Sequence, residues 1–313
     1  MKLSGNTIFI TGGTSGIGRG LAEALHKLGN QVIISGRRTA LLDEVTAANP
    51  GMASIRLDVT GLDSIRNAAS ELTRRFPDLN VVINNAGFMP FDDVSGPVDD
   101  DLAQELITTN LLGPIRVTSA LIEHLKTKVE ATVLYTSSVL AYVPIASNAI
   151  YSATKAALHS YALSQRFQLR DTGVRVQEIA PPWVDTDLIY KSGDPRAMPL
   201  PDFIEQTLVA LATDAPEVIV DGIKAMRDNP GANEHALFEA FNHSLVEKPI
   251  PHRRVSLCLS VNLLKYERKL PCPVSPSPKP QRLPKERRPR CPPSTASWAG
   301  CPTSSASCPT ARR

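Results

Sequence analysis

A glycine-rich segment, TGGTSGIG at residues 11–18, joins the first β-branched run of the chain to a stretch with helical spacing. A tight strand-to-helix turn needs residues that tolerate positive φ, and a pyrophosphate needs close backbone approach and the N–H groups of a helix start. Gly12, Gly16 and Gly18 meet both needs. A glycine-rich turn alone would be weak evidence for a binding site. Because this one follows a strand and opens a helix, it predicts a site for the phosphates of a dinucleotide.

The alternation of strand-like and helix-like segments continues along the chain. The β-branched runs, apolar on both faces, are TIFIT (7–11), QVIIS (31–35), SIRLDV (54–59), VVINN (81–85), TVLYTSS (132–138) and VRVQEIA (174–180). Strands separated by helices predict right-handed βαβ units and an α/β domain. We expect a doubly wound parallel Rossmann-type sheet with helices on both faces, whose ligands lie at the carboxyl ends of the strands.

Local signals also predict where individual elements begin and end. Gly29 and Gly173 occupy positions where a helix should stop, and TGLD (60–63) has the pattern of a capping box. Residues 99–127 have apolar positions at helical spacing, with Asn110, a poor helix former, expected to bend that helix. Further along, the spacing predicts a helix within 203–214, a short strand within 217–223 and a last helix within 232–247.

The chain changes character after residue 248. Residues 1–248 carry 21 Lys and Arg against 29 Asp and Glu, whereas residues 249–313 carry 13 against 2. The second segment also holds all five Cys and 13 of the 26 Pro. We therefore predict a single domain over 1–248 and a disordered, basic Pro/Arg/Ser-rich tail over 249–313, because such a composition buries too little apolar surface to offset its chain entropy.

The role of the tail stays open. Its charge could contact nucleic acid or an acidic surface, but KERRPR (285–290) is short and has no interleaved aromatic residue, so no nucleic-acid partner is expected. The tail could equally be a solvated extension, or the product of an altered reading frame or a retained intron. Its five Cys lack metal-ligand spacing, so no metal site is predicted.

The predicted domain shows no secretory leader and no run approaching the ~18 apolar residues of a membrane span. We therefore expect a cytoplasmic protein without a membrane-spanning segment.

Charged and polar residues at further strand ends indicate which dinucleotide is bound. Arg37 and Arg38 follow the second strand, where an acid would accept hydrogen bonds from the ribose of NAD. A guanidinium suits a 2′-phosphate, so NADP(H) is predicted over NAD(H). Asp58, after the third strand, could accept a hydrogen bond from the adenine amino group, or it could simply form a turn. NNAG (84–87), after the fourth strand, supplies Asn85, Ala86 and Gly87, whose expected role is mainly structural.

A second group of residues predicts acid–base chemistry. Tyr151 and Lys155 are four residues apart, so they share one face of a helix. A free phenol has a pKa near 10, and we expect the ammonium and the positive ring of the cofactor to lower it. Ser138, at the end of the fifth strand, can donate a hydrogen bond to a substrate oxygen, and Asn110 can hold a water near Lys155. Tyr–Lys pairs of this spacing also occur by chance on helix surfaces.

Taken together, these motifs resemble the short-chain dehydrogenase/reductase superfamily, strongly over residues 5–190 and loosely over 191–248. The resemblance implies a Rossmann fold, hydride transfer at the nicotinamide, Tyr151 as proton donor, Lys155 on the nicotinamide ribose, and a homodimer or homotetramer. It implies the catalytic set Asn110, Ser138, Tyr151 and Lys155. It also implies a cofactor set of Gly12, Thr14, Ser15, Gly16, Ile17, Gly18, Arg37, Arg38, Asp58, Asn85, Ala86, Gly87, Tyr151, Lys155, Pro181 and Thr186.

Other stretches are similar to a subfamily that includes the oxidoreductase of the lipoteichoic-acid D-alanylation operon: TSSVLAYVP, APPWVDTDL and MPLPDF. One departure follows the sixth strand, where the family has Pro-Gly and this chain has Pro181–Pro182. The loop should therefore be stiffer, with Trp183 either a wall of the substrate pocket or a packing residue.

The expected substrate is a small carbonyl compound or secondary alcohol, with its specificity set by residues 88–98, 139–150 and 182–202. The apolar and aromatic residues there make a hydrophobic ketone or aldehyde plausible. The alternative is a catalytically silent dinucleotide-binding or scaffold protein of the same fold, which would bind NADPH without turnover.

Overall fold

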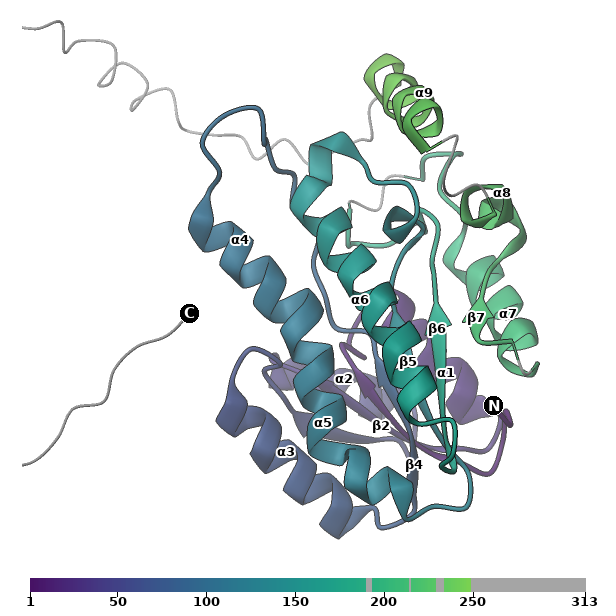
Figure 1. Cartoon of the computed structure of the whole chain (residues 1–313). Helices are drawn as coiled ribbons and strands as arrows, with labels where there is room; N and C mark the ends of the chain where they lie inside the picture. Colours follow the sequence, from purple (N-terminus) through teal and green to yellow (C-terminus); the bar gives the residue numbers. More distant parts are fainter. Residues whose placement is uncertain (190–192, 214, 229–233, 249–313) are drawn as a thin grey trace, which may run out of the picture. The chain divides into compact units, whose positions relative to one another are not determined.

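The computed structural model describes residues 1–189, 193–213, 215–228 and 234–248 (Figure 1). These residues fall within one compact unit, Met1–Val255. The predicted tail, 249–313, lies outside the described residues, so its predicted disorder and the domain boundary at residue 248 stay predictions. Within the described part of the chain, no helix is both long enough and apolar enough to cross a bilayer.

The described residues form a seven-stranded sheet in which every pair of neighbouring strands is parallel. Its strands are β1 (Thr7–Thr11), β2 (Gln31–Gly36), β3 (Ala53–Arg56), β4 (Leu79–Asn84), β5 (Ala131–Thr136), β6 (Val174–Ile179) and β7 (Glu217–Val218). The strand order is β3-β2-β1-β4-β5-β6-β7, so the direction of winding reverses between β1 and β4. A crevice at such a reversal is where doubly wound sheets bind their ligands.

Helices cover both faces of the sheet, which confirms the predicted fold class. They are α1 (Gly16–Lys27), α2 (Thr39–Ala48), α3 (Leu62–Arg75), α4 (Asp100–Ile107), α5 (Gly113–Lys126), α6 (Ala149–Gln168), α7 (Leu200–Leu211), α8 (Lys224–Arg227) and α9 (Glu234–Glu247). Figure 1 shows α3, α5 and α6 side by side on one face. Buried residues of α1, α2 and α7 belong to the core on the other face.

The strands supply both cores because their side chains alternate between the two faces. In β1, Ile8 and Ile10 pack into the core that includes α1, α2 and α7, whereas Phe9 packs into the core that includes α3, α5 and α6. All three side chains are fully buried. Each contributes about 1.5–3 kcal/mol on leaving water, which explains why these runs are apolar at every position.

Some predicted helix boundaries are confirmed and others are wrong. Gly29 follows α1 with φ of 85°, as predicted for a helix stop. Gly173 does not end a helix: α6 stops at Gln168, and Gly173 immediately precedes β6. There a Cβ would lie 2.8 Å from the Val129 carbonyl oxygen, so close packing against a neighbouring loop explains this glycine.

The capping box at TGLD is also wrong. Helix α3 begins at Leu62 after Gly61, with no side-chain cap. In a capping box the Asp63 carboxylate would accept from the Thr60 N–H, but here that N–H donates to the Asp58 carboxylate at 3.0 Å, as does the Thr60 hydroxyl at 2.7 Å. Asp58 therefore forms a local turn that takes the donor a capping box needs, and the helix begins one residue later than predicted, after Gly61.

Asn110 interrupts its helix, as expected from its low helix propensity. Residues 99–127 divide into α4, a π-helical turn at Thr108–Leu112 and α5. Such turns inside helices are rare and place a side chain where an unbroken helix would not. Here the turn buries Asn110 completely.

Candidate active site

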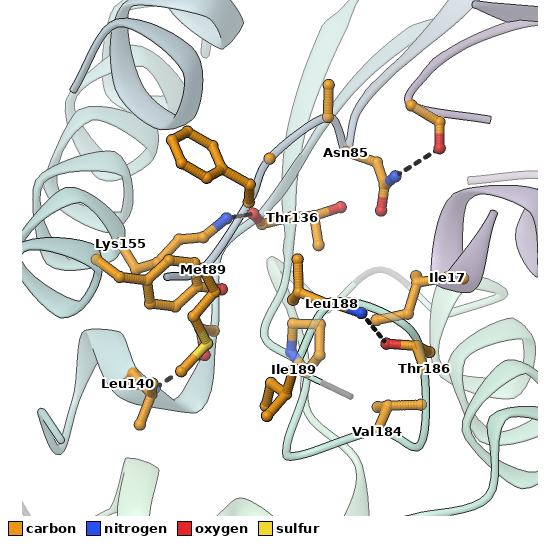
Figure 2. A pocket seen from close by; sticks show the side chains of 18 of the residues that line it. Ile17, Asn85, Met89, Thr136, Leu140, Lys155, Val184, Thr186, Leu188 and Ile189 are labelled. Atoms are coloured by element: carbon orange, nitrogen blue, oxygen red, sulfur yellow. Dashed lines mark hydrogen bonds between the residues drawn. The ribbon is translucent and has the colours of Figure 1, made fainter. Parts of the chain in front are cut away.

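A cavity of about 960 Å³ opens at the carboxyl ends of the strands (Figure 2). Residues that follow β1, β2, β4, β5 and β6 contribute to its wall, together with Tyr151 and Lys155 of α6. Sixteen of the eighteen predicted site residues line it: Gly12, Thr14, Ser15, Gly16, Ile17, Arg37, Arg38, Asp58, Asn85, Ala86, Gly87, Ser138, Tyr151, Lys155, Pro181 and Thr186. The two that do not are Gly18 and Asn110.

The glycine-rich loop leaves the first turn of α1 open toward this cavity. Gly12 and Gly16 have φ of 69° and 53°, in the left-handed region that favours glycine. A Cβ on Gly12 would lie 2.9 Å from the Ala86 Cα. Ser15 precedes the helix without capping it through its side chain, so no capping side chain among the described residues takes up the first N–H groups of α1, which can bind an anion. This loop therefore fits the diphosphate of a dinucleotide.

Gly18 has a packing role instead. A Cβ there would lie 2.2 Å from the Gly12 carbonyl oxygen and 2.4 Å from the Asn85 Nδ2. Asn85 Nδ2 donates to the carbonyl oxygens of Thr11, at 3.2 Å, and Gly12, at 3.3 Å. Gly18 thus makes room for the side chain that ties the end of β4 to the phosphate loop.

Thr11 is a supporting residue that sequence reasoning missed. Its hydroxyl oxygen accepts hydrogen bonds from the backbone N–H groups of Asn85 and Ala86, both at 3.0 Å. This contact fixes β1 and β4 together at the point where winding reverses. A Thr at a strand end carries no distinctive signal, because β-branched residues are common throughout strands.

The ends of β2 and β3 place charged groups at one part of the cavity. Arg37 and Arg38 are exposed, and neither guanidinium has a hydrogen-bond partner among the described residues. The Asp58 carboxylate accepts from the Thr60 N–H and hydroxyl, so the turn role predicted as one of its two alternatives is present. Those bonds lower the pKa of Asp58, and the charges of Arg37 and Arg56 add to the effect.

Tyr151 and Lys155 meet Ser138 in the buried part of the cavity. Tyr151 and Lys155 are each 4% exposed and lie one turn apart on α6. The Lys155 ammonium lies 5.4 Å from the centre of the Tyr151 ring and donates to the Thr136 carbonyl oxygen at 2.8 Å, as Figure 2 shows. One bond leaves further donors on the ammonium, which fits the ribose hydroxyls of a nucleotide.

Burial dominates the electrostatics of this cluster. It raises the pKa of Tyr151 well above its usual value near 10, and a hydrogen bond with the Ser138 hydroxyl acts in the opposite direction. It lowers the pKa of Lys155 to about 8, and the charge of Glu178 opposes that change. In the protein alone desolvation of the phenolate outweighs the hydrogen bond with Ser138, and the predicted lowering, which included the charge of the cofactor ring, stays a prediction.

Asn110 lies behind the cavity wall. Its Oδ1 accepts from the Phe88 N–H at 3.1 Å, and its Nδ2 donates to the Phe88 carbonyl oxygen at 2.9 Å. Asn110 thus holds the segment after β4 in place. Its predicted role in holding a water near Lys155 stays a prediction.

The other end of the cavity is apolar. Its lining includes Phe88, Met89, Leu140, Ile145, Trp183, Val184, Leu188, Ile189, Met226, Phe241 and Leu245. Most of these fall in the segments predicted to set specificity, including Trp183, whose ring also lies under the Arg196 guanidinium at 5.1 Å. Met226, Phe241 and Leu245, from α8 and α9, were missed. Phe241 and Leu245 have helical spacing, but only the tertiary fold brings them here.

The fold and cavity define a dinucleotide-binding α/β protein of Rossmann type. The model of the short chain dehydrogenase family matches residues 6–196. An uncharacterized oxidoreductase of Bacillus subtilis, DltE, is 36% identical over 248 residues, which cover 77% of this chain and 98% of DltE. A fission-yeast (Schizosaccharomyces pombe) NADP-dependent 3-hydroxy acid dehydrogenase is 29% identical over 252 residues, covering 74% of this chain and 96% of the yeast protein.

A solved structure shares the fold. A short chain dehydrogenase from Burkholderia cenocepacia, crystallised in complex with NADP, superimposes with a TM-score of 0.68 at 26% identity. The match covers 80% of this chain and all of that one. The chain therefore belongs to the short-chain dehydrogenase/reductase family, and within it is similar to the DltE oxidoreductase, as the sequence motifs predicted.

Proposed function

We propose that this protein is an NADP(H)-dependent oxidoreductase that interconverts a carbonyl compound and a secondary alcohol. The observation that carries the proposal is the position of Ser138, Tyr151 and Lys155 in the cavity that also receives the uncapped start of α1. One end of this cavity suits a diphosphate and the other suits an apolar substrate. The buried hydroxyls and ammonium lie toward the apolar end.

Each residue of the cluster has a distinct task in this proposal. The bound nicotinamide supplies or accepts the hydride. Tyr151, buried and with its pKa raised by burial, is protonated at neutral pH and suited to give a proton to the substrate oxygen in reduction. Ser138 donates a hydrogen bond to that oxygen as charge develops on it. Lys155 binds the ribose and stabilises the phenolate that remains.

The remaining predicted cofactor residues are proposed to hold the dinucleotide along the cavity. The N–H groups at Thr14, Ser15, Gly16 and Ile17 face the diphosphate, Asp58 and Asn85–Gly87 border the adenosine and its ribose, and Pro181 and Thr186 border the carboxamide. The Thr186 hydroxyl accepts from the Leu188 N–H at 3.4 Å, which orders this loop (Figure 2). The family resemblance, together with the lining of the cavity, supports these assignments.

NADP(H) is proposed over NAD(H) because Arg37 and Arg38 present two guanidinium groups where the 2′-phosphate would lie. An Arg37→Ala variant should lose about 10–100-fold in affinity for NADPH, since a charge-assisted bond contributes about 1.5–3 kcal/mol. Its affinity for NADH should not change. Arg56→Ala is the matched control, because Arg56 is also exposed and also acts on Asp58. Equal loss for both coenzymes would show that the 2′-phosphate lies elsewhere.

The activity itself is tested by incubating the full chain with NADPH and a panel of apolar ketones and aldehydes, following the absorbance of the reduced nicotinamide. Turnover that Tyr151→Phe abolishes supports the proposal. Tight NADPH binding with no turnover on the panel would instead favour a silent binding or scaffold protein. A chain ended after Lys248 should be as active as the full chain if residues 1–248 are the functional domain.

A further inference from the structure

A buried carboxylate lies outside the cavity, beneath the catalytic cluster. Glu178, in β6, is completely buried and does not line the cavity. In the sheet it stands opposite Tyr135 of β5 and Glu217 of β7. Acidic side chains are almost never fully buried unless they are paired, so this position needs an explanation.

Both oxygens of Glu178 are bound by residues adjacent to the proposed catalytic groups. Oε1 accepts a hydrogen bond from the Ser137 hydroxyl, and Ser137 immediately precedes Ser138. Oε2 lies 2.8 Å from the Nδ1 of His159. His159 is one helical turn beyond Lys155 on the same face of α6. One carboxylate therefore joins the strand end that carries Ser138 to the helix face that carries Lys155.

We propose that Glu178 is a positioning residue for the reaction, which fixes Ser138 and Lys155 relative to each other through Ser137 and His159. This inference rests on the proposed function. The backbone supports it, because the Ser137 N–H donates to the Ile179 carbonyl oxygen at 2.8 Å and holds the two strand ends in register. The charge of the Glu178 carboxylate also acts on the Lys155 ammonium, and raises the pKa of Lys155 against the larger effect of burial.

The charged groups around Glu178 have partners of their own, so Glu178 stays bound to Ser137 and His159. Glu217, which stands opposite Glu178 in the sheet, accepts hydrogen bonds of 2.5 and 3.0 Å from the Arg227 guanidinium. Arg227 also lies over the Tyr142 ring, which in turn meets the His159 ring edge-on at 5.2 Å. The hydrogen bond to Glu178 and the charges of Glu178 and Glu217 raise the pKa of His159, while burial and Arg227 lower it.

These pairings also account for the three ligand-type side chains His159, Glu178 and Glu217, whose ligand atoms lie within 4.8 Å of one another. Arg227 already neutralises Glu217, and Ser137 and His159 already occupy Glu178. The cluster therefore needs no metal ion to satisfy its charges.

Glu178→Gln is the central test, because an amide keeps the shape and can still hydrogen-bond while it removes the charge. We expect kcat to fall by about 10²-fold, the size of effect that misplaced reacting groups produce, with little change in the Kd for NADPH. The alkaline limb of the pH profile of kcat/KM should also move to lower pH, because Lys155 loses the anion that favours its charged form. Loss of packing alone would not move that limb.

Two further variants test the two hydrogen bonds of Glu178 separately, and one control tests the neighbouring acid. Ser137→Ala and His159→Gln each break one arm and should each lower kcat, whereas adding either to Glu178→Gln should lower it little further. Glu217→Gln is the matched control on the neighbouring strand, and should leave the alkaline limb unchanged, because the charge of Glu217 acts on His159 and is not among the causes of the Lys155 shift. Wild-type kcat and an unmoved limb in Glu178→Gln would overturn the proposal, as would an equal shift of the limb in Glu217→Gln.

A second readout separates this proposal from the proposed function. Titration of the Lys155 side chain by NMR, with labelled lysine and no added coenzyme, should give a lower pKa in Glu178→Gln than in the wild type. If the wild type turns over no carbonyl compound, the proposed reaction is wrong and the positioning role falls with it. The titration would still show whether Glu178 sets the charge of Lys155, and an unchanged pKa would refute that part independently.

Discussion

The two ends of the cavity are built in different ways. The nucleotide end consists of glycines, backbone N–H groups, short polar side chains and the two arginines, all of which directly follow β1, β2 and β4. The substrate end consists of apolar side chains from segments as distant in sequence as Met89, Trp183 and Leu245. The first end is fixed by local backbone conformation, and the second by how loops and helices pack. Changes to the two ends should therefore have separable effects.

The largest effect on turnover is expected for Tyr151, which lies between the nucleotide end and the substrate end of the cavity. Tyr151→Phe removes the proposed proton donor while keeping the buried ring, so kcat/KM should fall by about 10²–10⁴-fold. NADPH affinity should stay within about twofold, because the ring still packs. Steady-state kinetics and coenzyme titration check both values. A variant with wild-type turnover would remove Tyr151 from the mechanism, and one that lost NADPH binding as well would show that the two ends are not separable.

The next prediction concerns the buried charge at this boundary. Lys155 has a folded-state pKa of about 8, against about 10.5 in the unfolded chain. Between these values the unfolded chain holds a proton that the folded chain has released, so the free energy of unfolding should rise with pH, by up to about 3 kcal/mol from this group.

Denaturant unfolding of the wild type and of Lys155→Met at several pH values measures this contribution. The variant should lack the part of the rise that the wild type shows between about pH 8 and 10.5. Parallel curves for the two proteins would mean that Lys155 keeps an ordinary pKa in the folded chain.

A third prediction perturbs the nucleotide end alone. In Gly12→Ala the new Cβ would lie 2.9 Å from Ala86 at a residue with φ of 69°. Strain of this kind costs about 1–3 kcal/mol, so the Kd for NADPH should rise by roughly 10-fold or more. Isothermal titration measures it, with Gly96→Ala as control, because nothing lies within 4 Å of a Cβ there. Equal affinities in the two variants would show that the loop does not carry the diphosphate.

The difference between the ends also explains what the sequence could predict. The phosphate loop, the strand-end arginines and the Tyr–Lys pair each depend on spacing within a few residues, and they converge on one cavity. The contributions of Met226 and Phe241, and the bond from Thr11 to β4, depend on contacts between distant segments. Periodicity identifies such residues as buried, but it does not say what they face.

Two differences between expectation and structure, one in the site and one in the fold, have the same origin. The pKa of Tyr151 was predicted from a neighbouring ammonium and the cofactor ring, whereas the depth of burial, which a sequence does not show, raises it in the protein alone. The capping box failed because Asp58, and not Asp63, accepts a hydrogen bond from the Thr60 N–H. In both cases the local pattern was present and a competing interaction outweighed it.

The smallest predicted effect perturbs the substrate end alone. Leu245→Ala shortens one apolar side chain of the lining. Burying a leucine side chain contributes about 1.5–3 kcal/mol, and a large apolar ketone should lose part of that amount in binding free energy. KM should rise by a few fold to about 10-fold, with kcat and NADPH affinity near wild type. Leu163→Ala, on the exposed side of α6, is the control. A fall in kcat without a change in KM would mean that α9 acts on the catalytic cluster rather than on substrate binding.

The most direct test of the whole account is a crystal structure of the protein with NADP and an alcohol product. We predict the diphosphate at the first turn of α1, the 2′-phosphate at Arg37, and the nicotinamide beside Lys155, with the product oxygen in hydrogen-bond contact with both Tyr151 and Ser138. A coenzyme bound in the reverse direction, or a nicotinamide out of reach of the Tyr151 hydroxyl, would contradict it.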